Sequence, residues 1–353
     1  MKSYRLFLLP PLLAVTLAPL TGIAQEEPPE REPDYFLDTP QTSKYAVILT
    51  GPTVGTENEN QFRQWSFSLH DILVRDYGYT SERISLLYAD GDTSIAGGER
   101  IDGACDRNGI ESALADLAAR AQTGDQVTLY LMGHGNGADE EAKFNIVGPD
   151  ITGVEFAGML DQFSQQDVVI INTTSASYGF SSMLSGEGRV VISATRSPSE
   201  RYDPVFSRYF IEALDSRNGD QDKNNRVSML EAFEYARASV EQWYAEQGRL
   251  ASEHAGLDDN GDAMFALDPR ADAGDGRLAE IAYIDTLEDD TAGLGEEALD
   301  LKAKMQELER SIFILRGRKA DFLTDVYWQR MEELLVQLAR TTGQFNALTG
   351  QES

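Results

Sequence analysis

The chain has 353 residues, of which 41% are hydrophobic, 25% charged and 9% aromatic, as in ordinary globular proteins. Disordered and fibrous classes are therefore excluded. With 30 Lys and Arg against 59 Asp and Glu, the formal net charge is −29, and no basic cluster is present. Nucleic acid is therefore excluded as the expected partner. The single cysteine, Cys105, cannot form an internal disulfide, so the fold depends on its hydrophobic core.

The first 24 residues have the parts of a secretory signal peptide. Lys2 and Arg5 supply positive charge, and residues 6–20 are apolar but interrupted by prolines. Gly22 and Ala24 are the small residues expected before a cleavage site. The prolines argue against a lasting membrane helix, and no later stretch is apolar for long enough to span a bilayer. We therefore expect a periplasmic or secreted protein with no membrane span after cleavage; an uncleaved anchor is the alternative.

The main part of the chain alternates between short apolar runs and helical patterns. Residues 25–43 are rich in Pro and Glu and predict a flexible linker. From residue 44 onward, several apolar runs lack alternation, as strands buried on both faces do. This predicts an α/β domain over residues 44–285, with a parallel sheet and helices on both faces. The expected strands are residues 45–50, 84–88, 127–132, 168–171 and 190–194, with 278–284 left open, and the expected helices between strands are 62–77, 109–121 and 153–163.

The periodicity changes past an acidic linker at residues 286–292. Residues 293–343 carry two heptad-like apolar seams, with a turn within residues 317–324 and a tail at 344–353, which predicts an α-helical hairpin with coiled-coil packing. Two interpretations stay open: the hairpin packs on its own domain, or it binds a partner, most simply as a homodimer. The seams contain Leu301, Met305, Leu308, Ile312 and Leu315 in the first helix, and Tyr327, Met331, Leu334 and Leu338 in the second.

Of the three histidines, only His134 is expected at the carboxyl edge of the parallel sheet, where such folds bind their ligands. It follows the third expected strand directly, in LMGHGNG, and the flanking glycines let a ligand approach the backbone. One strand later, the sequence INTTSASYG places small hydroxyl residues at the same edge of the sheet. A Gly-rich loop without chemistry is the alternative. The candidate site residues are His134, Thr174, Ser175 and Ser177.

These features resemble the caspase–haemoglobinase fold, and the legumain-like cysteine peptidases in particular. In that family a His-Gly after the third strand partners an Ala-Cys after the fourth. The segments YAVILTG, ISLLYADG and VVISATRSPSE are also similar to the family's strands. The resemblance covers roughly residues 44–285. It implies a caspase-like fold and a cleft that takes a peptide or protein, with endopeptidase activity where the nucleophile is intact.

Thr174 stands where the family has its catalytic cysteine. A thiol ionises near neutral pH, whereas a threonine hydroxyl ionises far higher, and threonine nucleophiles generally use their own terminal amine as base. Cys105 cannot substitute, since it lies in a loop before the second expected helix. We therefore expect a pseudopeptidase that binds a peptide or protein in the former active-site cleft. The alternatives are a hydrolase that uses His134 with Thr174, Ser175 or Ser177, and a scaffold that acts through its C-terminal helices.

Residues 220–231 match the spacing of an EF-hand calcium loop. Glu231 stands at position 12, where a bidentate carboxylate is expected, and Val227 supplies the apolar residue of position 8. Position 6 is Asn225 instead of Gly, but Asn tolerates left-handed backbone better than most residues. This loop predicts a weak Ca²⁺ site, whereas no phosphate-binding loop or His/Cys zinc set is present. The candidate ligands are Asp220, Asp222, Asn224, the carbonyl of Arg226, Ser228 and Glu231.

Overall fold

The structure is a computed structural model that describes residues 35–39, 41–52, 55–269, 274–286 and 293–350. The expected signal peptide and most of the expected linker lie outside the described residues. Within the described part of the chain, no helix combines the length and the apolar character needed to cross a membrane.

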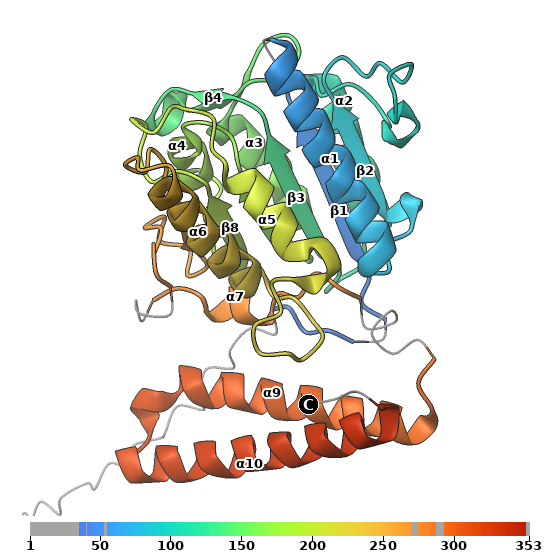
Figure 1. Cartoon of the computed structure of the whole chain (residues 1–353), viewed down its shortest axis with the longest axis vertical. Helices are drawn as coiled ribbons and strands as arrows, with labels where there is room; N and C mark the ends of the chain where they lie inside the picture. The colour runs from blue at the N-terminus through green and yellow to red at the C-terminus, as the bar shows by residue number, and fades with distance from the viewer. Residues whose placement is uncertain (1–34, 40, 53–54, 270–273, 287–292, 351–353) are drawn as a thin grey trace, which may run out of the picture. The chain divides into compact units, whose positions relative to one another are not determined.

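The core of the α/β domain is a six-stranded sheet (Figure 1). Its strands are β1 (Lys44–Thr50), β2 (Ile84–Tyr88), β3 (Gln126–Met132), β7 (Asp167–Asn172), β8 (Arg189–Ser193) and β9 (Gly256–Asp258). They follow the order β2-β1-β3-β7-β8-β9, in which only β9 is antiparallel to its neighbour. The predicted α/β class and its five strands are confirmed. The sequence does not predict β9, because three residues are too few to show a period.

Helices cover both faces of this sheet. They are α1 (Thr56–Asp76), α2 (Arg107–Arg120), α3 (Gly153–Leu160), α4 (Ser177–Ser182), α5 (Phe206–Leu214), α6 (Met229–Glu246) and α7 (Arg277–Ile281). Successive strand side chains point to opposite faces. In β1, Ile48 therefore belongs to the apolar cluster shared with α1, α5 and α6, which lie in front of the sheet in Figure 1, whereas Leu49 belongs to the cluster on the other face with α2, α3 and α4. Residues 278–284, left open by the sequence, contain α7 and no strand of the sheet.

A small antiparallel sheet follows β3 and fixes the segment that carries His134. It consists of β4 (Gly135–Asn136), β5 (Lys143–Phe144) and β6 (Ile151–Thr152). His134 therefore lies directly between β3 and β4, with its carbonyl accepting the backbone N–H of Asn145 at 3.0 Å. A Cβ atom at Gly51 would lie 2.2 Å from the Asn145 carbonyl oxygen, so this close approach requires glycine. Short 3₁₀ helices complete the domain: η1 (Ser81–Arg83), η2 (Gly98–Arg100), η3 (Asp139–Glu141), η4 (Asp161–Phe163) and η5 (Asp215–Arg217).

The described end of the expected linker is attached to the domain. Phe36 is buried, and its backbone N–H donates to Asp167 at 2.7 Å. Asp38 forms ion pairs with Lys44 at 3.1 Å and with Arg226 at 2.6 Å, and both cations are buried. Phe36 and Asp38 are therefore fixed by contacts with strands and loops far along the chain.

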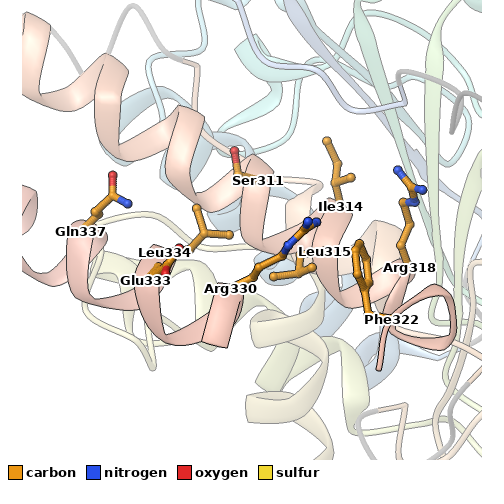
Figure 2. A pocket seen from close by; sticks show the side chains of 9 residues that line it. All are labelled: Ser311, Ile314, Leu315, Arg318, Phe322, Arg330, Glu333, Leu334 and Gln337. Atoms are coloured by element: carbon orange, nitrogen blue, oxygen red, sulfur yellow. The ribbon is translucent and has the colours of Figure 1, made fainter. Parts of the chain in front are cut away.

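The C-terminal hairpin consists of α9 (Glu296–Gly317), η6 (Lys319–Asp321) and α10 (Thr324–Thr349). The predicted seams are confirmed, since Met305, Leu308, Leu315, Tyr327 and Met331 are buried. Near the turn, a groove of about 350 Å³ lies between the two helices (Figure 2). Its apolar lining is Ile314, Leu315, Phe322 and Leu334, flanked by Ser311, Arg318, Arg330, Glu333 and Gln337.

Candidate functional site

The structure brings His134 and the predicted hydroxyl residues to one edge of the sheet. β3 and β7 are parallel neighbours, so their carboxyl ends meet. His134 comes two residues after β3, and Thr174 comes two residues after β7. The two loops touch, because the backbone N–H of Gly135 donates to Oγ of Ser175 at 3.2 Å. We call His134, Thr174, Ser175, Ser177 and Asp203 the His134 site.

His134 is oriented by a carboxylate that the sequence analysis does not identify. Its Nδ1 lies 2.9 Å from Oδ1 of Asp203, and Nδ2 of Asn58 on α1 donates to the other oxygen of Asp203 at 3.0 Å. The ring of Phe62 lies 5.6 Å from the imidazole in an edge-on arrangement. The hydrogen bond with Asp203 raises the pKa of His134 above its usual value. The imidazole is therefore held in one orientation and is only partly exposed.

Thr174, at the position of the family's nucleophile, has its hydroxyl bonded elsewhere. Its Oγ1 donates to Oδ1 of Asn172 at 2.8 Å, and its backbone N–H bonds to the same oxygen at 3.1 Å. The Asn172 amide is fixed in turn, since its Nδ2 donates to Oγ of Ser181 at 3.1 Å. Thr174 is 1% exposed, so a substrate carbonyl could not reach this hydroxyl without a movement of the loop.

The two serines are also bonded away from the imidazole. Oγ of Ser175 accepts from the N–H of Gly135 and donates to the Gly135 carbonyl at 3.4 Å. Oγ of Ser177 lies 3.0 Å from the hydroxyls of both Ser193 and Thr195, inside the domain. Among the described residues, no hydrogen bond joins His134 to Thr174, Ser175 or Ser177. The arrangement shown is therefore not a nucleophile bonded to its base.

The remaining histidines and the cysteine lie outside this site. Nδ1 of His70 lies 3.2 Å from Asp71 on α1, while Nδ1 of His254 lies 2.6 Å from Oε1 of Glu200. The carbonyl of Glu200 also accepts the backbone N–H of Ala176, the residue after Ser175. Glu200 is therefore a second residue near the site that was not expected from the sequence. Cys105 is fully buried among apolar side chains, and burial raises the pKa of its thiol well above the usual range.

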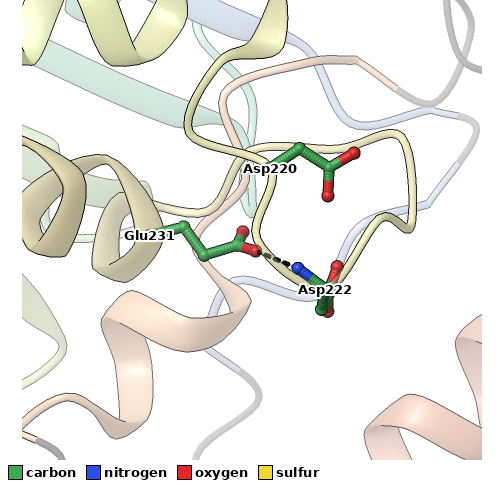
Figure 3. Close-up of side chains that lie close together, drawn as sticks. All are labelled: Asp220, Asp222 and Glu231. Atoms are coloured by element: carbon green, nitrogen blue, oxygen red, sulfur yellow. Dashed lines mark hydrogen bonds between the residues drawn. The ribbon is translucent and has the colours of Figure 1, made fainter.

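The predicted calcium loop contains a cluster of three carboxylates. One oxygen each of Asp220, Asp222 and Glu231 can be chosen so that all lie within 4.8 Å of one another (Figure 3). Ca²⁺ binds oxygens at about 2.3–2.6 Å, so ligands on opposite sides of one ion are separated by about twice that distance. The spacing of these three carboxylates therefore fits one ion. Burial raises the pKa of Asp222 to about 7, with a smaller contribution from the neighbouring carboxylate of Glu231.

The backbone of the loop turns around these carboxylates. Asp220 accepts the N–H groups of Asn224 and Asn225 at 3.1 and 3.0 Å. Asn225 has φ 67°, the left-handed conformation that its loop position requires, and Val227 is buried. Glu231 lies in the first turn of α6 and accepts from the backbone N–H and the hydroxyl of Ser228, each at 2.9 Å. The carboxylates are thus held in place by the loop and by the first turn of α6.

Comparisons with known proteins give only distant likenesses to solved structures. No family model matches the sequence, and no curated protein matches it. Among solved structures, the protein GSU0716 from Geobacter sulfurreducens is 10% identical with a TM-score of 0.38, over 61% of this chain and 92% of its own. The Drosophila initiator caspase Dronc is 10% identical with a TM-score of 0.37, over 62% of this chain and 79% of its own. Likenesses this weak decide nothing about the fold or the site of this chain.

Proposed function

We propose that the chain is a non-catalytic relative of the legumain-like peptidases that binds a peptide or protein segment at the His134 site. The observation that carries the proposal is the bonding of the hydroxyls. Thr174 donates to Asn172, and Ser175 is bonded to Gly135, while the imidazole of His134 is bonded to neither. Hydroxyl nucleophiles need a base within hydrogen-bond reach to become reactive. Binding without turnover therefore suits this arrangement better than hydrolysis.

Ligand binding at this place is supported by the position of the site. The carboxyl edge of a parallel sheet is where open α/β folds take their ligands. His134 is partly exposed there, and its fixed ring can donate or accept a hydrogen bond through Nε2. The resemblance to peptidases makes an extended peptide or a protein loop the proposed partner.

The test is a peptide library in which binding and cleavage are measured together on the mature protein. Peptides should be retained without cleavage, and His134→Ala should weaken their binding. His70→Ala is the matched control, since His70 lies on α1 beside Asp71. Peptide cleavage that disappears in His134→Ala would overturn the proposal.

A hydrolase is the second candidate function, and one contact favours Ser175 as its nucleophile. Ser175 is bonded to Gly135, the residue next to His134, whereas Ser177 is bonded within the domain. In that case the Ser175 hydroxyl would have to leave the Gly135 backbone and bond to the imidazole. Loss of cleavage in Ser175→Ala, with retention in Ser177→Ala, would identify this activity.

We also propose that Ca²⁺ binds the 220–231 loop and stabilises the domain. The spacing of Asp220, Asp222 and Glu231 supports this proposal, since three oxygens within 4.8 Å suit one hard cation. The ion would neutralise their repulsion and connect the loop to α6. Its role is structural in this proposal, because none of the three belongs to the His134 site.

Export and self-association complete the proposal. The sequence of residues 1–24 supports secretion or a periplasmic location, which cell fractionation with N-terminal sequencing would test.

Exposed apolar side chains on the hairpin, such as Leu323, Trp328 and Leu335, support a homodimer through the C-terminal helices. If the hairpin carried the whole function, the α/β domain would be a scaffold, and peptide binding would not depend on His134.

A further inference from the structure

Residues 35–39, which we call the N-terminal strap, lie against the α/β domain. Phe36 is 5% exposed and belongs to the apolar cluster in front of the sheet. Its backbone N–H donates to Oδ2 of Asp167, the first residue of β7, at 2.7 Å. A Cβ atom at Gly188 would lie 2.3 Å from the ring of Tyr35, so this ring packs directly against the Gly188 backbone. The strap is therefore attached by apolar packing and by a buried hydrogen bond.

The strap is joined to the predicted calcium loop through one carboxylate. Oδ2 of Asp38 lies 2.6 Å from Nη2 of Arg226, and Oδ1 lies 3.1 Å from Nζ of Lys44. The side chain of Arg226, at position 7 of the 220–231 loop, is 3% exposed and also pairs with Asp285 at 2.7 Å. Separating a buried ion from its partner is costly. The strap and the loop therefore share one buried ionic group, and movement of either one removes a partner from the other.

Arg226 belongs to the calcium loop through its backbone as well. Its N–H donates to Oδ1 of Asn224 at 2.7 Å, and its carbonyl is the candidate ligand of position 7. The next residue, Val227, is buried, and its carbonyl accepts the N–H of Ile284 at 3.0 Å. A bound ion would therefore fix the backbone of Arg226 from one side, while the ionic group holds its side chain on the other.

We propose that Ca²⁺ in the 220–231 loop strengthens the attachment of the N-terminal strap through Arg226, and that the attached strap strengthens Ca²⁺ binding in turn. This inference rests on the proposed calcium site. Without the ion, repulsion between the loop carboxylates loosens the segment that carries Arg226, so the strap detaches more often. Coupling between two sites is reciprocal, and it typically changes each affinity by about 5–150-fold.

Calcium titration by isothermal calorimetry on the full mature protein measures one direction of the coupling. Asp38→Asn removes the charge that pairs with Arg226, and it should raise Kd for Ca²⁺ about fivefold. Phe36→Ala detaches the strap without changing a charge, and it should raise Kd by a similar factor. This second variant separates strap attachment from a direct effect of the Asp38 charge on the ion. Asp71→Asn is the matched control and should bind like wild type, because Asp71 pairs with Arg100 outside the strap and the loop.

Chymotrypsin measures the other direction, since it can cleave after the buried Phe36 only when the strap has left the domain. Mass spectrometry of the products should show this cleavage to be about fivefold slower at saturating calcium than in chelator. A synthetic peptide with the sequence of residues 30–42 measures the activity of the protease itself in both buffers.

The outcomes separate this coupling from the calcium site on which it rests. Wild type that binds no calcium would overturn both. If wild type binds calcium, a wild-type Kd in either Asp38→Asn or Phe36→Ala, folded by circular dichroism, would overturn the coupling alone. Cleavage after Phe36 at a rate that calcium does not change would do the same. Weaker calcium binding in the folded variants, together with slower cleavage of wild type in calcium, would support it.

Discussion

Nδ1 of His134 lies 2.9 Å from Oδ1 of Asp203, in a loop that follows β8. A carboxylate at this nitrogen fixes the tautomer and the orientation of an imidazole, as it does in catalytic triads. The imidazole of His134 is thus held in place by Asp203, while the hydroxyls of Thr174 and Ser175 are bonded to other groups. In the proposed pseudopeptidase, the difference from an active peptidase therefore concerns the nucleophile, while His134 is held in an ordered position.

Asp203→Asn should lower the pKa of His134. Asp203 raises the pKa of His134 in the folded state, so the pair stabilises fully below the unfolded value of about 6.5. Its contribution is lost as pH rises through the folded pKa. The variant should therefore be less stable than wild type at about pH 5 and about as stable as wild type at about pH 9. The loss in free energy of unfolding at pH 5 should be less than about 1 kcal/mol, because both side chains are partly exposed.

The measurement is an NMR titration of the histidine ring protons, assigned with His134→Gln, together with urea unfolding at both pH values. Asp71→Asn is the matched control, because Asp71 contacts His70 and should leave the titration of His134 unchanged. An unaltered His134 pKa in Asp203→Asn would contradict the pairing.

Thiol reagents should not label the folded protein. Cys105 is fully buried, and burial raises the pKa of its thiol, so little thiolate is available. Iodoacetamide should modify Cys105 only as fast as the domain unfolds, and guanidinium should make the reaction rapid. Mass spectrometry of the labelled peptide checks this expectation, with Cys105→Ser as the blank. Rapid labelling under native conditions would contradict the burial of the thiol.

The sheet was predictable because its strands are long enough to show their pattern. β1 and β3 are apolar along most of their length, as strands covered on both faces are. The seams of the hairpin repeat every three or four residues and could be recognised for the same reason. β4 and β9, by contrast, have two and three residues, and no period can appear over so short a length.

Asp203 and Glu200 were not predictable for a different reason. Both lie in the loop after β8, and their partners, His134 and His254, are distant in sequence. A carboxylate in a polar loop carries no local pattern that identifies its partner. Only the folded loop brings the carboxylate to the imidazole. In the sequence of so acidic a chain, many other carboxylates are equally good candidates for the partner of a histidine.

Arg226→Gln should be strongly destabilising. Its guanidinium is 3% exposed and pairs with Asp38 at 2.6 Å and with Asp285 at 2.7 Å. Removing one member of a buried ionic group upsets its charge balance, at a cost of about 3–5 kcal/mol, even though Asp38 keeps its pair with Lys44. Arg107→Gln is the control, because its pairs with Glu111 and Glu155 are exposed, and it should cost at most about 1 kcal/mol. Equal urea midpoints for the two variants would contradict this account.

The hairpin should make the molecular mass depend on protein concentration. Trp328 and Leu335 are about half exposed on α10, and their exposure to water is unfavourable. The double variant Trp328→Glu/Leu335→Glu should remain monomeric where wild type associates, since charges at an apolar contact oppose it. Gln329→Glu, at an exposed position of the same helix, should associate like wild type. Light scattering that reports a monomer for wild type at every concentration would exclude the dimer.

Calcium should raise the melting temperature of the mature protein. Asp220, Asp222 and Glu231 repel one another in the ion-free loop, and a cation removes that repulsion. An ion that binds only the folded state stabilises it by about 2.7 kcal/mol at a hundredfold excess over Kd. We expect Kd on the order of 10⁻⁴–10⁻³ M, because the loop is single and has Asn225 in place of glycine.

Glu231→Gln separates the two roles of that residue. Gln can still accept from Ser228 at the start of α6, but its amide nitrogen cannot accept from the backbone N–H groups of Gln221 and Asp222 as Oε1 of Glu231 does. The ion-free protein should therefore lose some stability, and the calcium-dependent gain should largely disappear. Glu297→Gln, an exposed position in the first turn of α9, should keep the full gain. Thermal melts in chelator and in millimolar calcium check both variants against wild type. Identical melts of wild type in the two buffers would refute the calcium site, and a full gain in Glu231→Gln would place the ion elsewhere.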